Sequence, residues 1–221
     1  MRVCASALPA VMPDAIKVVL GYLLGSVCGS LVLGRLRGVD IRAQGSGSAG
    51  GTNAFRTQGL WFALGVGVID GGKSALASWI GGFGIADGGH ALRVALLAGG
   101  AAAVGHVWPL YHGFHGGKGV AAVLGLLLVL WPVGLAVMLG VMLLMLTTTG
   151  FVGLGSMVAA VALIPTAVLF APASHRLMWT VAAVAIAAFI LFTHRSNLHR
   201  LRAGTEHRFE RARVLARLFR L

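Results

Sequence analysis

The sequence has few acidic residues, few cysteines and few charged residues of any kind. Asp and Glu number six in 221 residues, and charged residues make up 11%. A soluble domain carries about 25% charged residues, so this chain lacks the polar shell that a soluble fold needs. Two cysteines, Cys4 and Cys28, are too few for a disulfide framework or a cysteine metal site. The scarcity of carboxylates also argues against a divalent metal, so we expect none.

Apolar residues dominate what is present. They make up 57% of the chain, and the mean hydropathy is +0.88. Runs long enough to cross about 30 Å of hydrocarbon recur along it. These runs cover about residues 15–33, 60–80, 91–110, 120–146, 152–170 and 177–192. The pattern predicts an all-α integral membrane protein and one polytopic domain over residues 1–221. Residues 1–194 are expected to be membrane-embedded, with cytoplasmic loops at 35–59 and 111–119 and a basic tail at 195–221.

The distribution of arginine predicts the topology. The loop 35–59 holds four arginines and one acid, and eight arginines follow His194. Basic segments stay in the cytoplasm, which accounts for the tail more simply than nucleic-acid binding does, so we expect no nucleic-acid partner. The chain must then cross an even number of times after His112, which requires the run 120–146 to break at Trp131-Pro132. We therefore predict seven transmembrane helices, with the N-terminus extracytoplasmic and the C-terminus cytoplasmic.

This topology gathers three polar segments on the cytoplasmic side. They are residues 45–56 (GSGSAGGTNAFR), 105–120 (GHVWPLYHGFHGGKGV) and 194–208 (HRSNLHRLRAGTEHR). Glycines let backbone N–H groups approach a ligand, and successive N–H groups at a helix N-terminus bind anions. The glycines expected to act in this way are Gly47, Gly50, Gly116, Gly117 and Gly119. The segments therefore predict a phosphate-binding site.

The side chains of the first two segments suit the same ligand. Neutral hydrogen bonds are available from Ser46, Ser48, Thr52 and Asn53. Arg56 offers a bidentate clamp for phosphate, and Lys118 offers a full charge. The GxxxxGK[ST] spacing of a nucleotide-binding P-loop is absent. Alternatively, Arg56 could anchor the chain to lipid head groups, and Lys118 could extend from a helix end toward water.

The third segment supplies groups for chemistry on an alcohol. His194 and Asn197 are three residues apart, so they share one helix face, and Glu206 follows them. A histidine at the membrane surface can position or deprotonate a hydroxyl. The alternatives are a histidine at a helix C-terminus, an asparagine C-cap, and a glutamate paired with a tail arginine.

Two charged residues lie inside the second apolar run. Asp70 and Lys73 are three residues apart, and charges inside a membrane are functional by default. We predict that they form an ion pair that supports the motif loops; the alternative is a direct part in the chemistry. His106, near the second segment, is expected to donate or accept a hydrogen bond behind the site.

The three segments together resemble the motifs of the bacterial acyl-phosphate:glycerol-3-phosphate acyltransferases, the PlsY family. Residues 45–56 resemble its first motif, residues 114–121 its second and residues 194–206 its third. The resemblance implies transfer of an acyl group from acyl phosphate to the 1-hydroxyl of glycerol 3-phosphate, giving lysophosphatidic acid and phosphate. It implies seven spans in a bacterial inner membrane, no cofactor, no metal and no coenzyme A donor. We expect the partners to be these two substrates and the lipid bilayer, and the chain to act as a monomer.

On this basis we assign roles to the residues. Ser46, Arg56 and Lys118 are expected to bind phosphate, with Ser156 reaching in from the run 152–170. His194 and Asn197 are expected to hold the hydroxyls of glycerol 3-phosphate, and Glu206 to orient its neighbours. We place His194, Lys118 and Ser46 nearest the chemistry. The proton of the attacking alcohol could also pass to the phosphate oxygens of the donor, since acyl phosphate is already activated.

The sequence also departs from the family pattern. Ser48 stands where an asparagine is usual, and Gly51 where an alanine is usual. His115 replaces a usual lysine, which predicts the loss of one charge that faces phosphate. Gly153 lacks a hydroxyl that relatives carry at this position.

Two other classes of protein would share some of these features. A small anion transporter also points helix N-termini at an anion, but it places them at the midplane and is built from repeats. No internal repeat is visible here. A lipid-binding scaffold would explain the basic tail but not the Gly-Gly-Lys-Gly turn. Phosphate release from acyl phosphate separates an enzyme from both.

Overall fold

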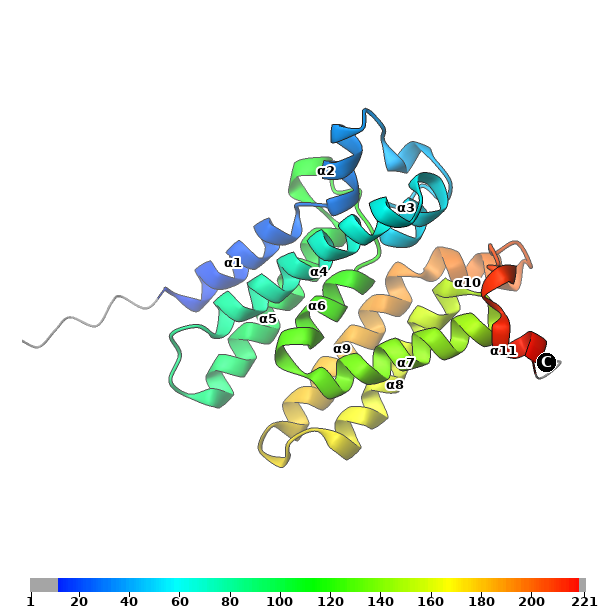
Figure 1. The fold of residues 1–221 in the computed structure, drawn as a ribbon. Coiled ribbons are helices and arrows are strands. Elements are labelled where there is room, and N and C mark those ends of the chain that lie inside the picture. The colour runs from blue at the N-terminus through cyan, green and yellow to red at the C-terminus, as the bar shows by residue number, and fades with distance from the viewer. Residues whose placement is uncertain (1–11, 219–221) are drawn as a thin grey trace, which may run out of the picture.

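The computed structural model describes residues 12–218, so Cys4 lies outside the described part. This part is helical, which confirms the prediction of an all-α protein (Figure 1). Its α-helices are α1 (Asp14–Gly25), α2 (Gly29–Leu36), α3 (Gly51–Gln58), α4 (Leu60–Gly82), α5 (Gly88–Val107), α6 (Val120–Leu130), α7 (Pro132–Thr149), α8 (Val152–Phe170), α9 (Arg176–Thr193), α10 (Arg195–Arg202) and α11 (Val214–Leu218). Short 3₁₀ turns lie at Ile41–Ala43, Leu110–His112, Ala173–His175 and Glu210–Ala212.

Five of the helices within residues 12–218 are long and apolar enough to cross a membrane: α4, α5, α7, α8 and α9. A sixth candidate is the pair α1 and α2, which is bent by 42°. The helix α6 is apolar but has only 11 residues. The predicted span at 15–33 is thus covered by two helices, with an interruption between Gly25 and Gly29 that was not predicted.

The interruption of the first span is stabilised by α4. The carbonyl oxygen of Val27 accepts a hydrogen bond from Lys73 Nζ (2.8 Å). The backbone N–H of Gly29 donates to Asp70 Oδ1 (2.9 Å). Backbone groups freed by a broken helix have no water partner inside a membrane and must be satisfied by protein. The charged pair on α4 supplies both partners.

The predicted break at Trp131-Pro132 is confirmed. The helix α6 ends at Leu130 and α7 begins at Pro132. Proline suits the first position of a helix because its missing N–H would be unpaired there in any case. The break is uneven, with 11 residues before it and 18 after it, so that α7 alone is long enough to span.

Close helix packing in the first half of the chain depends on small residues. At Gly21, an added Cβ would lie 2.3 Å from the carbonyl oxygen of Ala98 on α5. At Gly25, it would lie 2.2 Å from the carbonyl oxygen of Ala102. Only glycine permits this approach of α1 to α5, which is the usual means of packing helices in a membrane.

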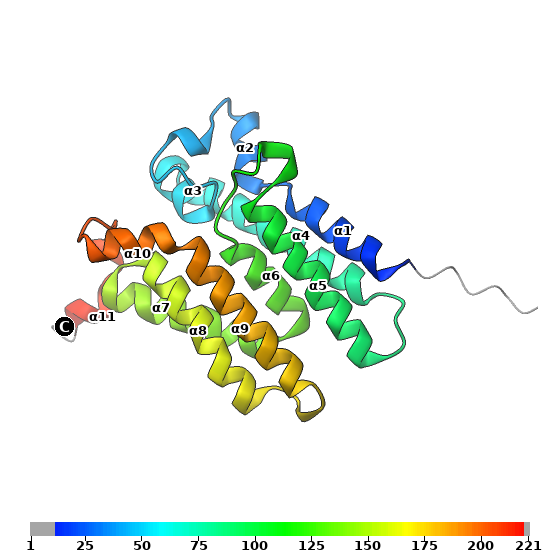
Figure 2. The same cartoon turned by 180° about the vertical axis from the view of Figure 1, so that it is seen from behind.

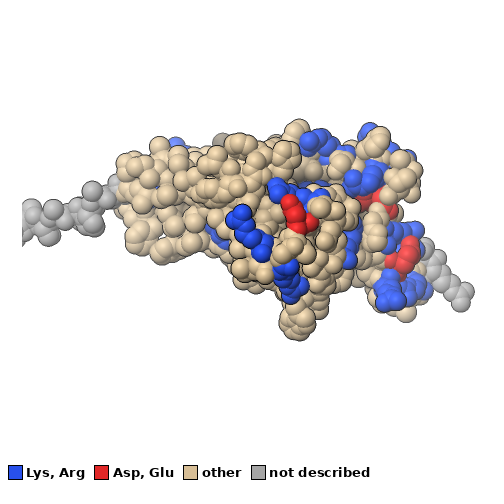
Figure 3. Space-filling view, turned by 90° about the horizontal axis from the view of Figure 1, so that it is seen from above, with Lys and Arg blue, Asp and Glu red and all other residues tan. Residues whose placement is uncertain are grey.

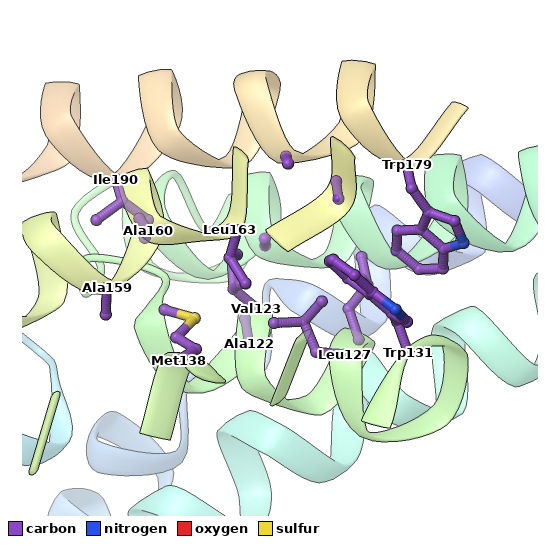
Figure 4. Close-up of a cluster of buried hydrophobic side chains, with 14 of the residues drawn as sticks. Ala122, Val123, Leu127, Trp131, Met138, Ala159, Ala160, Leu163, Trp179 and Ile190 are labelled. Carbon is purple, nitrogen blue, oxygen red and sulfur yellow. The ribbon is translucent and has the colours of Figure 1, made fainter. Parts of the chain in front are cut away.

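In the second half, large apolar side chains fill a core between α6, α7, α8 and α9 (Figure 4). Leu127, Leu163 and Ile190 have no exposed surface. The rings of Trp131 and Trp179 pack with centroids 4.8 Å apart. Figures 1 and 2 show that α3 and α10 lie at the same end of the two halves. This packing fixes the end of α9, from which the third polar segment continues.

Candidate active site

The three polar segments surround one cavity of about 100 Å³, together with residues of α4, α7 and α8. Twelve of the fifteen predicted site residues line it. They are Ser46, Ser48, Gly50, Thr52, Asn53, Arg56, Lys118, Gly119, Ser156, His194, Asn197 and Glu206. The structure thus brings together side chains from positions 46 to 206 of the chain.

Three predicted glycines do not line the cavity, and their N–H groups are used within the protein. The N–H of Gly116 donates to Val107 O (3.1 Å), and that of Gly117 donates to His106 O (3.1 Å). The N–H of Gly47 donates to Gln44 O (3.1 Å). These three N–H groups are therefore not free to bind an anion, and Gly116 and Gly117 act as close-packing positions. The glycines at 116 and 117 are needed for close packing, since a Cβ at Gly117 would lie 2.1 Å from His106 Nε2.

Asn53 shapes the first loop instead of offering free hydrogen bonds. Its Oδ1 accepts from the N–H of Ser46 (2.9 Å). Its Nδ2 lies 3.0 Å from each of three carbonyl oxygens, those of Ile41, Gln44 and Ser48. The side chain is 2% exposed and holds the loop closed from inside.

The first segment ends in a helix N-terminus directed at the cavity. The helix α3 begins at Gly51 with Gly50 as its N-cap, and Gly50, Gly51 and Thr52 line the cavity. The first helical N–H bond is that from Ala54 to Gly50 O (3.0 Å). The N–H groups before it are the unpaired donors that every helix start carries, and such donors bind anions. This nest lies at the start of α3, not at the Gly116-Gly117 pair.

Lys118 belongs to a chain of hydrogen bonds with α10 and the segment after it. Its Nζ donates to Asn197 Oδ1. Asn197 Nδ2 donates to Glu206 Oε1 (2.7 Å), and Arg200 Nε donates to Glu206 Oε2 (2.7 Å). Glu206 thus holds both Asn197 and Arg200, and Asn197 holds Lys118. The predicted orienting role of Glu206 agrees with this arrangement.

The cavity has more positive than negative charge. Glu206 is paired with Arg200, whereas Arg56 and Lys118 have no carboxylate partner within residues 12–218. Arg56 Nε is buried and has no hydrogen-bond acceptor in this part of the chain. The pKa of Lys118 is lowered to about 8, mainly by burial and also by the charge of Arg200. Two half-buried cations without a carboxylate partner in the described part of the chain, beside a helix N-terminus, suit an anionic ligand.

His194 is buried at the junction of α9 and α10 and lines the same cavity. Its Nδ1 lies 2.9 Å from the carbonyl oxygen of Ile190. A carbonyl oxygen can only accept, so Nδ1 carries the hydrogen and Nε2 keeps a lone pair. Burial lowers the pKa of His194 to about 4, and the charge of Lys118 acts in the same direction. The imidazole is therefore neutral at pH 7 and can accept a hydrogen bond through Nε2.

Ser156 and Gly153 complete the wall on α8. Ser156 Oγ donates to Val152 O (3.0 Å), which leaves the oxygen lone pairs of Ser156 for a ligand. A Cβ at Gly153 would lie 2.7 Å from Asn197 Nδ2. A side chain at position 153 would therefore collide with Asn197, which approaches α8 closely at this glycine.

The predicted pair of Asp70 and Lys73 is confirmed, and His106 joins it. Lys73 Nζ lies 3.0 Å from Asp70 Oδ1 and 3.0 Å from His106 Nδ1. All three side chains are at most 6% exposed. The backbone oxygen of His106 holds the N–H of Gly117, and Ala49 N–H donates to Gly116 O (3.3 Å). The cluster thus supports both motif loops, and Asp70 and His106 also line the cavity.

One further expectation is wrong, and one charged residue of the cavity was not predicted. His115 is exposed and does not line the cavity, so its exchange for a lysine removes no charge from the cavity. Arg200 lines the cavity but was not predicted. Its spacing offers the signal, because His194, Asn197 and Arg200 follow at three-residue intervals along one helix face.

Charged side chains on the surface are concentrated in one part of the molecule. Figure 3 shows Lys and Arg side chains gathered toward the C-terminal part of the face, whereas the part toward α1 is almost uncharged. The polar cavity therefore lies at the basic end of an otherwise apolar molecule.

Comparison with known proteins assigns these features to a family. The family model described as glycerol-3-phosphate acyltransferase matches residues 15–204. The glycerol-3-phosphate acyltransferase of Synechococcus sp. (strain CC9902) is 42% identical over 200 residues, covering 89% of this chain and 96% of the relative. That of Symbiobacterium thermophilum is 40% identical over 199 residues, with the same coverage.

Two solved structures share the fold. Both are of PlsY (YgiH), an integral membrane glycerol 3-phosphate acyltransferase. Its glycerol 3-phosphate form superposes with a TM-score of 0.79 at 33% identity, covering 91% of this chain and 98% of that chain. Its lysophosphatidic acid form superposes with a TM-score of 0.78 at 32% identity, with the same coverage. The protein is thus an integral membrane member of the glycerol-3-phosphate acyltransferase (PlsY) family.

Proposed function

We propose that this protein transfers a fatty acyl group from acyl phosphate to the 1-hydroxyl of sn-glycerol 3-phosphate. The products are lysophosphatidic acid and inorganic phosphate, and the reaction is the first acylation of phospholipid synthesis. The observation that carries the proposal is the cavity with two cations, Arg56 and Lys118, that lack a carboxylate partner within residues 12–218. Both substrates carry a phosphate group that would pair with them.

The protein crosses a bacterial inner membrane seven times, with its N-terminus outside and its C-terminus in the cytoplasm. Support comes from the six longer candidate spans, counting α1 and α2 as one, together with the short α6. The basic end that holds the motifs would then face the cytoplasm. Residues 1–221 form one domain, in which residues 1–194 are membrane-embedded and residues 195–221 are a cytoplasmic tail. The chain is proposed to act as a monomer.

Phosphate binding falls to the cations and to the start of α3. Arg56 and Lys118 supply charge, and the unpaired N–H groups at the start of α3 supply directed hydrogen bonds. The hydroxyls of Ser46, Ser48 and Thr52, with Ser156 opposite, add neutral contacts. Asn197 and Glu206 act by holding Lys118 in place, and Asn53 and the glycines by shaping the loops. Gly47, Gly116 and Gly117 serve the fold of these loops.

The chemistry needs an oriented hydroxyl and a stabilised transition state. His194 Nε2 accepts a hydrogen bond from the 1-hydroxyl, whose oxygen attacks the acyl carbon. The new ester C–O bond forms as the bond from carbon to the phosphate oxygen breaks. A histidine with a pKa of about 4 is a weak base, so the proton passes to the departing phosphate. Lys118 and the α3 amides stabilise the developing negative charge. The proposed reaction uses no metal, no cofactor and no coenzyme A donor.

The test is phosphate release by the purified protein in lipid. The protein receives palmitoyl phosphate, with and without glycerol 3-phosphate and with no added metal. Release that depends on glycerol 3-phosphate, and is lost in Lys118→Ala, is the expected result. A folded protein that releases no phosphate from palmitoyl phosphate or a shorter donor would refute the proposal and favour an anion transporter.

A further inference from the structure

The chain continues beyond the family-matched region and folds back against the α7–α8 junction, beside the cavity. The family match ends at residue 204, whereas the described chain reaches residue 218. We call residues 205–213 the tail strap. Three donors of the strap bind carbonyl oxygens at the α7–α8 junction: Arg208 Nε to Thr149 O (2.9 Å), the N–H of Phe209 to Gly150 O (2.9 Å), and Arg213 Nε to Thr148 O (3.3 Å). The last carbonyls of a helix need such partners, so the strap is fixed at this junction.

From this anchor, Phe209 reaches the first motif. Its ring centroid lies 4.9 Å from Cζ of Arg56 and 6.1 Å from the ring centroid of Phe55, both on α3. The ring of His207 packs edge-on against it at 4.8 Å. A guanidinium within about 6 Å of an aromatic ring centroid is held by a cation–π interaction. Phe209 therefore links α3 to the end of α7 beside the cavity.

The nature of this contact matters for Arg56. Glu206 already binds Asn197 and Arg200, and Arg56 Nε has no acceptor within residues 12–218. A carboxylate in contact with Arg56 would hold it in place but would compete with phosphate for it. An aromatic face holds the guanidinium and leaves its charge and its N–H groups for the ligand.

We propose that Phe209 is a positioning residue, which holds Arg56 in the orientation that binds a substrate phosphate. The inference rests on the proposed function, since it takes a phosphate as the ligand of Arg56. Phe209 itself does not line the cavity and acts only through Arg56.

The test compares steady-state kinetics of Phe209→Leu and Phe209→Trp in lipid. Leucine keeps apolar bulk but has no aromatic face, so the KM for glycerol 3-phosphate or for acyl phosphate should rise by about 2- to 30-fold. The kcat should change little, and tryptophan should restore the wild-type KM. The matched control is Phe192→Leu, which removes a similar contact, 4.5 Å from Arg195, away from the cavity and should leave both KM values unchanged.

A double-mutant cycle shows whether Phe209 acts through Arg56. In an Arg56→Ala background, Phe209→Leu should have no further effect on KM. Equal effects in both backgrounds, or a wild-type KM for both substrates in Phe209→Leu, would overturn the inference. A loss of thermal stability without a change in KM would likewise assign Phe209 to the fold alone.

Binding separates this inference from the proposed function. Calorimetric titration of glycerol 3-phosphate measures binding without turnover. If the KM for glycerol 3-phosphate rises in Phe209→Leu, this variant should also bind glycerol 3-phosphate more weakly. If only the KM for acyl phosphate rises, the affinity for glycerol 3-phosphate should stay unchanged. A wild-type protein that binds glycerol 3-phosphate but releases no phosphate would refute the proposed reaction only. An unchanged affinity together with an unchanged KM for acyl phosphate would refute the role of Phe209 only.

Discussion

Two buried polar regions of the molecule use similar residues in opposite ways. In the first, Lys73 pairs with Asp70 and His106, and Asp70 and Lys73 bind the backbone of the broken first span; Asp70 and His106 also reach the wall of the cavity. In the second, Arg56 and Lys118 line a cavity and have no carboxylate partner within residues 12–218. Burying a charge is costly unless it is paired. A paired cluster therefore stabilises the fold, whereas unpaired cations at a cavity indicate a missing anion.

The largest effect should follow from breaking the paired cluster. Asp70→Asn leaves Lys73 buried beside a neutral amide and weakens the support of Gly29. We expect the free energy of unfolding to fall by about 3–5 kcal/mol, measured by denaturation in detergent micelles. The double variant Asp70→Leu/Lys73→Met should recover part of this loss, because no charge is left unpaired. A stability for Asp70→Asn within about 0.5 kcal/mol of wild type would contradict the structural role.

Removal of an unpaired cation should instead affect catalysis. Lys118→Ala should lower kcat/KM by about 10²- to 10³-fold, since it removes charge stabilisation of the phosphate. Its thermal stability should not fall, because burial of this lysine has no compensating carboxylate contact. Phosphate release is the assay, and Arg93→Gln, an exposed arginine on α5, is the control for loss of one positive charge. A stability loss as large as that of Asp70→Asn would contradict the contrast between the two regions.

A smaller effect should follow when the lysine stays but its support is removed. Asn197→Ala deletes the side chain that joins Lys118 to Glu206. We expect the KM for glycerol 3-phosphate to rise by about 10-fold, as for one hydrogen bond to a charged group. Ser196→Ala, on the exposed side of the same helix, should behave as wild type. An unchanged KM in Asn197→Ala would remove the assignment of Asn197 to the site.

The pH dependence should give the smallest effect. Burial lowers the pKa of Lys118 to about 8, so its positive charge is present below pH 8 and is lost as the pH rises through 8. The KM for glycerol 3-phosphate should therefore rise above pH 8. His194, with a pKa lowered to about 4, should add no inflection near pH 6.5. In Lys118→Arg the charge persists, so a rise above pH 8 in that variant as well would assign it to another group.

The sequence predicted the elements whose causes are local. The proline after Trp131 marked the break between α6 and α7, and the three-residue spacing of Asp70 and Lys73 marked their ion pair. The arginine distribution and the even number of membrane crossings predicted that the three polar segments lie on the same side of the membrane. These inferences need only hydropathy, arginine counts and helix periodicity.

The sequence did not predict features whose causes are tertiary. No proline or charge marks the break of the first span, because its backbone is stabilised by Asp70 and Lys73 from α4. The N–H groups of Gly116 and Gly117 meet the carbonyls of α5, which no local pattern reveals. Phe209 reaches Arg56 only because the tail strap returns beside the cavity.

The most direct test of the account is a calorimetric titration of glycerol 3-phosphate into the protein in lipid nanodiscs, without acyl donor. Three proteins are compared: wild type, Lys118→Met and Arg93→Gln. The account predicts that wild type and Arg93→Gln bind alike and that Lys118→Met binds at least about 10-fold more weakly. Equal affinity in all three proteins would show that the unpaired cation does not bind the phosphate, and would contradict the account.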